Sequence, residues 1–524
     1  MRKILFILLF PFFTEGQIVL QLDTFSRSVP DVGFNGNTVR GPSWVDSVFN
    51  DSVASMHPDI LRYPGATAAN FWDWDNGWFF PQSVLDTAIT DTIYIMNAGW
   101  YSFDTIDIRL IRFQEALDQI DSEGLFIMNM MSSNVVIQSQ ALRNAINDGV
   151  VINKVELGSE INHNNIFKIM KYPTAGDYAR ECSLYIDSIK SILPNAEIAV
   201  VGGNTGSSNP RVNHWNDSIY NMLDSVDALV WHPYLYLKDV DTLFTTQEIL
   251  AYPFYHIPKN EKWRCFQDTI SKLQDYEIWV TEYNLFDKTH DLRYTNTWAH
   301  VLILSAMNNM LMSNNLVEMM LLHNVGGIIQ NFDALDTDND FRKKSTGLFA
   351  SIWNEHLSDM ITATRIEIPQ LLIDSVEYPN SSGLMTSIAF PKLFGWKFEN
   401  STDEVIILSN ISEDTIEVNV NNIINGNISW EKWTSDSLFS TIDSISYIKM
   451  RKDTSSTNIV LFPYSLNVAI SSLSTSIIPF PSEIVKKKLL KIVDVLGRET
   501  FPKKNMPLFY IYEGGVVEKR IILE

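Results

Sequence analysis

The stretch VELGSEIN at residues 155–162 is a short apolar run that ends in a carboxylate, and IWVTEYN at residues 278–284 has the same form. Apolar residues precede Glu160 in the first stretch and Glu282 in the second. A short apolar run bounded by polar residues is typical of a strand that is buried on both faces, as in a parallel sheet. The two stretches therefore predict parallel strands with acidic side chains at their ends.

Short apolar runs alternate with amphipathic helical stretches from about residue 30 to residue 358. The predicted strands end near Asn35, Tyr63, Met130, Gly158, Gly202, His232, Glu282 and His323. Helices are predicted at residues 106–122, 175–193, 262–274 and 297–312. About eight strand–helix units predict an α/β fold of the (β/α)8 TIM-barrel type. A doubly wound open sheet is the alternative, but no glycine-rich phosphate loop follows the first strand.

The pattern changes after about residue 359 to short β-branched segments separated by Asn, Ser, Asp and Gly. This pattern predicts an antiparallel β-sandwich at residues 359–472. Residues 17–29 alternate in the same way, so they may be counted with the barrel or as a strand of the sandwich. A Ser/Thr-rich linker at residues 471–476 leads into alternating strands, which indicate a small C-terminal β domain at residues 473–524.

The N-terminus has the pattern of a secretory signal peptide. Met1-Arg2-Lys3 is followed by an apolar run at residues 4–13 and by Gly16, where we expect cleavage. The run is too short to span a bilayer, and no later segment reaches about 20 apolar residues. The sequence therefore predicts a signal peptide at residues 1–16, the catalytic barrel at residues 17–358, no membrane span, and a secreted protein found outside the cell or on its surface.

The composition excludes some partners and cofactors. A net charge of −22 argues against nucleic acid as a partner, because phosphate binding needs clustered Lys and Arg. The two cysteines, Cys182 and Cys265, form no metal-ligand pattern; export permits a disulfide, and two buried free thiols are favoured. The stretch DTDND at residues 336–340 resembles the start of a calcium loop, but Phe341 stands where that loop needs Gly. We expect no metal and no cofactor.

Glu160 and Glu282 are candidates for catalysis because of where they lie. Barrel enzymes carry their catalytic groups at the C-terminal ends of the strands, and these two residues end the predicted fourth and seventh strands. Those strands lie across the barrel mouth from each other, so both side chains can face one substrate. Glycoside hydrolysis needs two such carboxylates, one as acid and one as nucleophile or base. The alternative is that either residue caps a helix or pairs with Lys at the rim.

These motifs resemble those of the clan of retaining (β/α)8 glycosidases that includes arabinofuranosidases, β-xylosidases and heparanase-type glucuronidases. The resemblance covers roughly residues 17–470, and it extends to LRYPG at 61–65, WHPY at 231–234 and LFPYS at 461–465. It implies a double displacement with Glu282 as nucleophile and Glu160 as acid/base. It also implies carboxyl groups about 5–5.5 Å apart and the higher pKa at Glu160.

The resemblance also implies a set of substrate-binding residues. It places Arg62 beside Glu282, and His232 or Tyr234 near the nucleophile or the sugar. Ser159 departs from the clan, which has Asn at this position for the sugar 2-hydroxyl. The loop FWDWDNGW at residues 71–78 offers aromatic faces for a sugar, although they can equally pack the loop itself. The predicted substrate-binding residues are Arg62, Trp72, Trp74, Asn129, Ser159, His232, Tyr234 and Asn284.

The C-terminal residues resemble the sorting domain of type IX secretion cargo from Bacteroidetes-type bacteria. The similarity rests on the segments 489–499, 507–512 and 517–522, and it implies the type IX secretion machinery as a partner. We therefore expect a secreted glycoside hydrolase that acts on a polysaccharide or oligosaccharide. A non-catalytic carbohydrate-binding protein or adhesin on a glycosidase fold is the alternative, and Ser159 is the feature that favours it.

Overall fold

The structure is a computed structural model that describes most of the chain. It describes residues 18–36, 42–80, 109–203, 209–224, 226–236, 245–263, 276–286, 294–327, 333–379, 383–439, 441, 448–454, 457–472, 489–494, 498, 500, 507–512 and 517–521. The chain divides into two compact units, Met1–Leu473 and Ser474–Glu524. The predicted signal peptide and Cys265 lie outside the described residues, and Cys182 is a buried free thiol.

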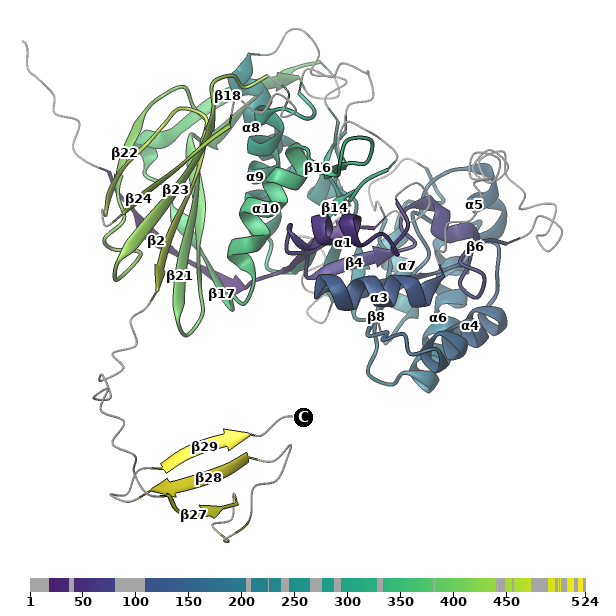
Figure 1. Cartoon of the computed structure of the whole chain (residues 1–524). Coiled ribbons are helices and arrows are strands. Elements are labelled where there is room, and N and C mark those ends of the chain that lie inside the picture. The colour runs from purple at the N-terminus through teal and green to yellow at the C-terminus, as the bar shows by residue number, and fades with distance from the viewer. Residues whose placement is uncertain are drawn as a thin grey trace, which may run out of the picture. The chain divides into compact units, whose positions relative to one another are not determined.

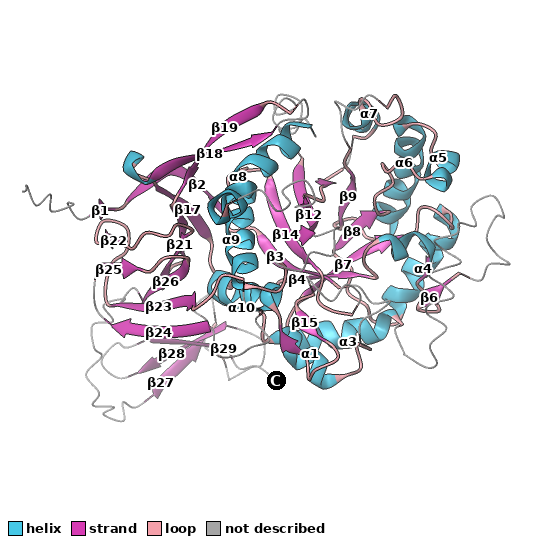
Figure 2. Cartoon of the chain, turned by 90° about the horizontal axis from the view of Figure 1, so that it is seen from above, coloured by secondary structure: helices cyan, strands magenta, loops and turns pink. Residues whose placement is uncertain are grey.

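Eight parallel strands close into a barrel in the first unit (Figure 2). They are β3 (Asp31–Asn35), β4 (Ile60–Tyr63), β7 (Glu123–Met128), β8 (Lys154–Leu157), β9 (Glu197–Val201), β10 (Ala228–Val230), β12 (Glu277–Tyr283) and β14 (Val317–His323). The last strand pairs with the first, from Met319 opposite Asp31 to His323 opposite Asn35, and this pairing closes the barrel. The predicted (β/α)8 barrel is confirmed, and each strand ends close to the predicted residue.

Helices surround these strands (Figure 2). They are α1 (Ser47–Ala54), α3 (Leu110–Ile120), α4 (Val135–Asn147), α5 (Ile166–Lys171), α6 (Ala175–Ile192), α7 (Trp215–Met222), α8 (Thr246–Trp263), α9 (Trp298–Met312) and α10 (Ser345–Leu357). Helix α6 begins with a capping box in which Thr174 and Asp177 bind each other's backbone N–H. The helices predicted at 106–122, 175–193 and 297–312 are confirmed. The one predicted at 262–274 falls almost entirely outside the described residues, and α8, which precedes it, was missed.

A separate apolar core fills the inside of the barrel. It is built from residues of β4, β7, β9, β10, β12 and β14: Ile60, Leu125, Ala199, Ala228, Val230, Trp279, Met319 and Leu321. All of them are at most 3% exposed, so the barrel is packed and has no pore. Polar side chains that meet inside the ring of strands must therefore do so at one of its ends.

A β-sandwich follows the barrel, as predicted. Its larger sheet has the order β2-β17-β20-β21-β26-β23-β24, and its smaller sheet the order β1-β22-β25. The strands are β1 (Ile18–Val19), β2 (Gln21–Ser28), β17 (Thr362–Glu367), β20 (Leu393–Glu399), β21 (Asp403–Asn410), β22 (Ile416–Asn419), β23 (Ile428–Ser435), β24 (Ile448–Thr454), β25 (Asn458–Leu461) and β26 (Ser465–Ser472). Strand β2 pairs with β17, so the N-terminal segment contributes a strand to the sandwich.

The larger sheet of the sandwich packs on the barrel helices. Along β21, Ile406 and Leu408 enter the core between the two sheets, whereas Val405 and Ile407 face the barrel and belong to its core. The Trp396 indole donates a hydrogen bond of 3.0 Å to Asn309 of α9. Helices α8, α9 and α10 lie between the barrel strands and the sandwich (Figures 1 and 2). The two parts thus share one continuous core.

Short elements complete the described chain. They are β5 (Trp72–Asp73), β6 (Trp78–Phe79), β11 (Leu235–Tyr236), β13 (Leu285–Phe286), β15 (Leu335–Asp336), β16 (Arg342–Lys343), β18 (Ile373–Pro379), β19 (Met385–Pro391) and the 3-10 helices η1 (Thr67–Phe71) and η2 (Gln370–Leu372). The second unit contains the antiparallel strands β27 (Leu489–Val493), β28 (Pro507–Tyr512) and β29 (Val517–Ile521). Among the described residues, no helix is both long and apolar enough to cross a membrane.

Candidate active site

Glu282 lies near the C-terminal end of β12 with a donor on each carboxylate oxygen. Arg62, from β4, donates a hydrogen bond of 2.6 Å from Nη1 to Oε1. The Tyr234 hydroxyl, which follows β10, donates one of 2.6 Å to Oε2. Asn35 at the end of β3 lies 3.4 Å from Oε1, and the His323 imidazole at the end of β14 lies 3.6 Å from Oε2. Four barrel strands or their ends thus converge on one carboxylate.

Arg62 is itself held by a second carboxylate, which the sequence analysis did not identify. Glu156, inside β8, accepts hydrogen bonds of 2.7 Å from Nε and 2.8 Å from Nη2 of Arg62. Both side chains are fully buried. Burial lowers the pKa of Arg62, but Glu156 and Glu282 outweigh it and raise that pKa. The guanidinium is therefore a permanent positive charge beside Glu282, as predicted for Arg62, and it contacts protein groups rather than solvent.

Glu160 lies in the loop after β8 and has a left-handed backbone conformation with φ of 52°. Its carbonyl oxygen accepts a hydrogen bond of 2.6 Å from Lys168 of α5. The carboxylate is 21% exposed, and an imidazole lies near each oxygen: His232 at 3.3 Å from Oε1 and His163 at 3.2 Å from Oε2. His232 also lies 3.8 Å from Oε2 of Glu282, so this ring bridges the two carboxylates.

The two carboxylates meet at one point of the barrel mouth. One ligand atom from each of Glu160, His232 and Glu282 lies within 4.8 Å of the other two. Within the part of the chain that the structure describes, these three side chains are also the group with the spacing to hold a metal ion. Each of them already has hydrogen-bonding partners in the protein, and Glu282 has its charge balanced by Arg62. One oxygen of each carboxylate thus lies within 4.8 Å of the other, which is close enough for both carboxyl groups to act on one bound molecule.

The electrostatics of the site favour both carboxyl groups in their ionised form. Burial raises the pKa of Glu282, but the charges of His232, His323 and Arg62 lower it to about 2. Burial likewise opposes ionisation of Glu160, yet His163 and His232 hold its pKa well below the usual value. The family resemblance implied the higher pKa at Glu160, whereas the neighbouring groups lower the pKa of both carboxyl groups.

Ser159 does not take the place of the clan's Asn in the structure. Its side chain is fully buried, and its hydroxyl lies 3.5 Å from Nη2 of Arg62. Its backbone N–H and carbonyl are both bound by the Asn70 side chain, at 3.2 and 2.8 Å. The buried hydroxyl faces Arg62 rather than solvent, which argues against the predicted substrate contact of Ser159.

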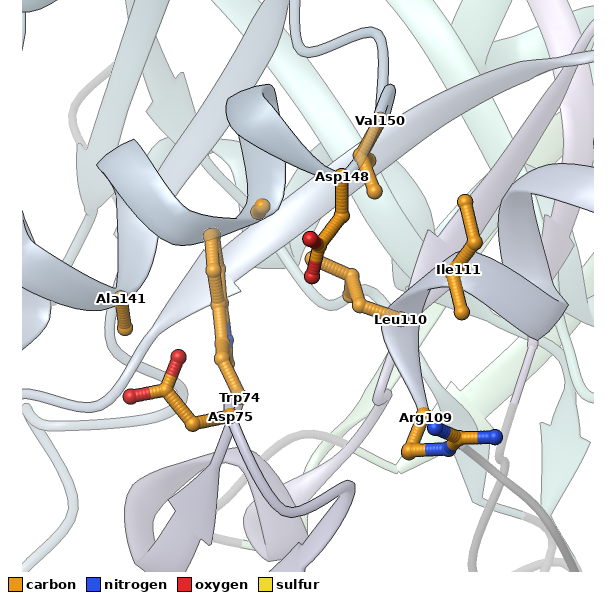
Figure 3. A pocket seen from close by; sticks show the side chains of 9 residues that line it. Trp74, Asp75, Arg109, Leu110, Ile111, Ala141, Asp148 and Val150 are labelled. Carbon is orange, nitrogen blue, oxygen red and sulfur yellow. The ribbon is translucent and has the colours of Figure 1, made fainter.

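The tryptophans of the loop after β4 pack inside the protein and do not line the carboxylates. Trp72 is fully buried, and its indole donates a hydrogen bond of 2.9 Å to the Tyr63 hydroxyl. Trp74 is 3% exposed, and its indole donates to the Ile127 carbonyl at 3.1 Å. Figure 3 shows Trp74 at the wall of a pocket of about 100 Å³ between α3 and α4, which neither catalytic candidate lines. The burial of Trp72 and Trp74 argues against the predicted stacking of a sugar on either ring.

Asn129 and Asn284 hold backbone rather than substrate. The Asn129 amide donates 3.0 Å to the Trp72 carbonyl, and its oxygen accepts from the backbone of Met131 and Ser132. The Asn284 amide donates 2.6 Å to the His323 carbonyl, and its oxygen accepts from Leu285 and faces the His300 ring. Both side chains are fully buried. Their predicted role as hydroxyl binders is replaced by a structural one, since their polar atoms already have partners.

Four of the predicted substrate-binding residues do gather around the carboxylates, namely Arg62, Ser159, His232 and Tyr234. Three residues at the carboxylates carry no prediction from the sequence, namely Asn35, Glu156 and His163. Only two of them carried a usable signal, because Asn35 ends the first strand and Glu156 is a charged residue inside an apolar run. The loop DTDND forms the β15–β16 turn, where Asp336 accepts hydrogen bonds from its own loop.

Several solved structures share this architecture. An arabinofuranosidase superposes with a TM-score of 0.64 at 14% identity, over 85% of this chain and 100% of its own. A family 51 α-L-arabinofuranosidase from Bifidobacterium longum gives 0.65 at 12% identity, over 87% of this chain and 98% of its own. A 4-O-α-L-rhamnosyl-β-D-glucuronidase from Fusarium oxysporum gives 0.56 at 13% identity, over 86% and 99%.

No protein-family model and no curated protein matches the chain. The structural similarity extends over nearly the whole length of the solved proteins, barrel and sandwich included, at identities of 12–14%. The chain therefore has the fold of the glycoside hydrolases to which these arabinofuranosidases belong.

Proposed function

We propose that the protein is a secreted glycoside hydrolase that cleaves a polysaccharide or oligosaccharide with retention of anomeric configuration. The observation that carries the proposal is the approach of Glu160 and Glu282 to within 4.8 Å at the barrel mouth. A separation near 5 Å leaves no room for a water between a general base and the sugar, so direct attack by a carboxylate is favoured.

Glu282 is the proposed nucleophile. Arg62 and Tyr234 occupy its two oxygens and its pKa is lowered to about 2, so it stays ionised at neutral pH. Its carboxylate attacks the anomeric carbon while the glycosidic C–O bond breaks and the leaving oxygen takes a proton from Glu160. Glu160 then removes a proton from water, the water oxygen attacks the same carbon, and the bond to Glu282 breaks.

The choice of sugar rests on the similar structures alone. Two of the three are named as arabinofuranosidases and the third as a rhamnosyl-glucuronidase. α-L-Arabinofuranosides are therefore the first substrates to test, followed by β-D-glucuronides, β-D-xylosides and plant and algal polysaccharides.

The proposal is tested with wild type, Glu282→Gln and Glu160→Gln on this panel. Both variants keep the side-chain volume, and each should lose on the order of 10³-fold or more in kcat for a substrate with a poor leaving group. Proton NMR of the first product should show the anomer of the substrate. Inversion would contradict retention. Equal sugar release by wild type and Glu282→Gln would contradict the assignment of Glu282, and binding without cleavage would indicate the carbohydrate-binding protein instead.

Export and sorting form a separate part of the proposal. The leader at residues 1–16 and the segment 473–524 would direct the chain through the type IX machinery of a Bacteroidetes-type bacterium to the cell surface or medium. The division of the chain between Leu473 and Ser474 supports a separate C-terminal unit. In such a host, removal of residues 473–524 should leave the protein in the periplasm, as measured by cell fractionation. Unchanged export would contradict the sorting role.

A further inference from the structure

The two oxygens of the Glu160 carboxylate face different histidines. Oε1 lies 3.3 Å from Nδ1 of His232, and Oε2 lies 3.2 Å from Nδ1 of His163. The proposed mechanism uses Glu160 both as acid and as base, so a proton must leave and return to this carboxylate in every cycle. Of the side chains that the structure describes, these two imidazoles lie in hydrogen-bonding reach of the carboxylate.

The environments of these histidines differ. The His232 side chain is 8% exposed, and its second ring nitrogen lies 3.0 Å from the Thr281 hydroxyl, so both nitrogens face protein groups. The His163 side chain is 49% exposed. A proton on His163 can therefore exchange directly with water, whereas one on His232 is enclosed between Glu160 and Thr281.

The backbone holds His163 in register with Glu160. The His163 N–H donates 3.0 Å to the Glu160 carbonyl. Lys168 donates 2.6 Å to the same carbonyl. Arg211, from the segment before α7, donates 2.8 Å to the Ile161 carbonyl and 3.1 Å to the His163 carbonyl. Two cationic side chains thus bind carbonyl groups of the loop that carries Glu160 and His163, and these bonds support the approach of His163 to Oε2.

The space beside this pair has the size of a water molecule. A cavity of about 10 Å³ is lined by Glu160, His163 and His232, together with Asn162, Val201, Gly202 and Val230. A volume of that order holds about one water and excludes a sugar ring. The cavity therefore offers a place for one water in contact with Glu160 and His163.

We infer that His163 is a positioning residue that supplies the working proton of Glu160 and takes it back. The inference rests on the proposed glycosidase function. In the first step the proton on Nδ1 of His163 moves to Glu160, which passes a proton to the glycosidic oxygen as that oxygen keeps the electron pair of the broken bond. In the second step Glu160 takes a proton from the attacking water and returns one to His163. The two steps add up to the hydrolysis of one glycosidic bond by one water molecule. Glu160 and His163 both return to their starting protonation states.

The other charged groups near this pair do not provide the same route. Glu282, Tyr234 and His323 influence Glu160 electrostatically; Glu282 and His323 are buried and Tyr234 is half-buried at the barrel mouth. Lys168 and Arg211 donate their hydrogen bonds to backbone carbonyls of the loop. Among the described residues, His163 alone combines contact with Oε2 and a half-exposed ring.

The test compares His163→Gln with wild type on two glycosides of a sugar that the wild type releases. The first glycoside carries 2,4-dinitrophenol, whose anion leaves without protonation. The second carries an alkyl alcohol, which must be protonated as it leaves. The alkaline limb of kcat/KM for the alkyl glycoside reports loss of the last proton from the Glu160–His163 pair. Removal of the imidazole should move this limb to lower pH by roughly one unit or more. At pH 7 the alkyl glycoside should lose about tenfold in kcat/KM, and the dinitrophenyl glycoside should be unchanged.

His214→Gln is the matched control. Its ring pairs with Asp217 at 2.8 Å with the same i,i+3 spacing, and its side chain is 67% exposed at the start of α7. This variant should have the wild-type pH profile with both substrates. His163→Asn serves as a second variant if His163→Gln does not fold, as judged by its thermal unfolding.

A wild-type pH profile for His163→Gln, or equal losses with both leaving groups, would overturn the inference. If the wild type cleaves no glycoside of the panel, the proposed function fails instead. The pairing is then read from the side-chain ¹⁵N signals of His163 at one pH, measured by NMR of ¹⁵N-histidine-labelled protein in wild type and Glu160→Gln. Glu160→Gln should shift the Nδ1 signal, because the carboxylate that faces this nitrogen at 3.2 Å is replaced by an amide. An unchanged signal would also overturn the inference.

Discussion

Arg62 is the residue that allows two carboxylates to be buried beneath the site. It bonds Glu156 and Glu282 at once, and all three side chains are at most 5% exposed. Removal of one partner from a buried ion pair leaves an uncompensated charge, which costs far more than loss of a pair at the surface. The arginine therefore supports the fold and holds the nucleophile ionised through the same contacts.

We predict that Arg62→Met destabilises the protein by about 3–5 kcal/mol, because Glu156 and Glu282 lose their common partner. It should also raise the pKa of Glu282, so any remaining activity would have its acid limb at higher pH. Denaturant unfolding at pH 7 measures the first effect. Arg365→Met is the control, since its pair with Asp23 is partly exposed and should be worth at most about 1 kcal/mol. Equal losses for the two variants would contradict the prediction.

At the scale of the elements, the barrel depends on close contact between strands β3 and β4. Gly33 of β3 pairs with Ile60 of β4. A Cβ atom built on Gly33 would lie 1.9 Å from the Ile60 carbonyl oxygen. No side chain fits there unless the backbone moves, and the contact belongs to the strands that carry Asn35 and Arg62 into the site.

We predict that Gly33→Ala destabilises the barrel by at least about 1–3 kcal/mol, because the overpacking falls on backbone atoms that cannot rotate away. Gly176→Ala in α6 is the matched control. Its nearest new contact would be the Met222 sulfur at 3.5 Å, and Ala favours helix over Gly by up to about 1 kcal/mol. Thermal unfolding of the two variants should therefore shift in opposite directions. A Gly33→Ala protein as stable as wild type would show that the strands can separate at low cost.

At the scale of the whole molecule, acidic groups gather at the N-terminal ends of the barrel strands, opposite the proposed active site. Lys154 lies 2.8 Å from Glu197, 3.5 Å from Glu123 and 4.0 Å from Asp31, each at the start of a different strand. Lys154 is thus the shared cationic partner of three carboxylates. Burial, together with repulsion from Asp59, Glu123 and Glu197, outweighs Lys154 and raises the pKa of Asp31 to about 6.

The raised pKa of Asp31 predicts the direction in which the stability of the protein changes with pH. The folded protein gains stability from Asp31 in its protonated form. This gain is fully present below the pKa of Asp31 in the unfolded chain, near 4, and is lost as the pH rises through about 6. Asp31→Asn should therefore raise the melting temperature relative to wild type at pH 7–8 and not at pH 4. Asp374→Asn should do the reverse, because the backbone bond from Ser375 lowers the pKa of Asp374 and its stabilising effect is lost at low pH. The melting temperatures of both variants are measured between pH 4 and pH 8. A change in melting temperature with the same sign and the same pH dependence in both variants would contradict this account.

The sequence by itself determined the alternation of strands and helices, the sandwich after residue 359, and the two carboxylates at strand ends. These features follow from local periodicity, and in a closed parallel barrel the strand ends gather at one face. The tertiary structure decided which polar atoms meet. It buried Trp72 and Trp74, engaged Asn129 and Asn284 with backbone, and paired Glu156 with Arg62 across 94 residues of sequence. Such partners are set by packing between distant segments, and no periodicity within one segment records them.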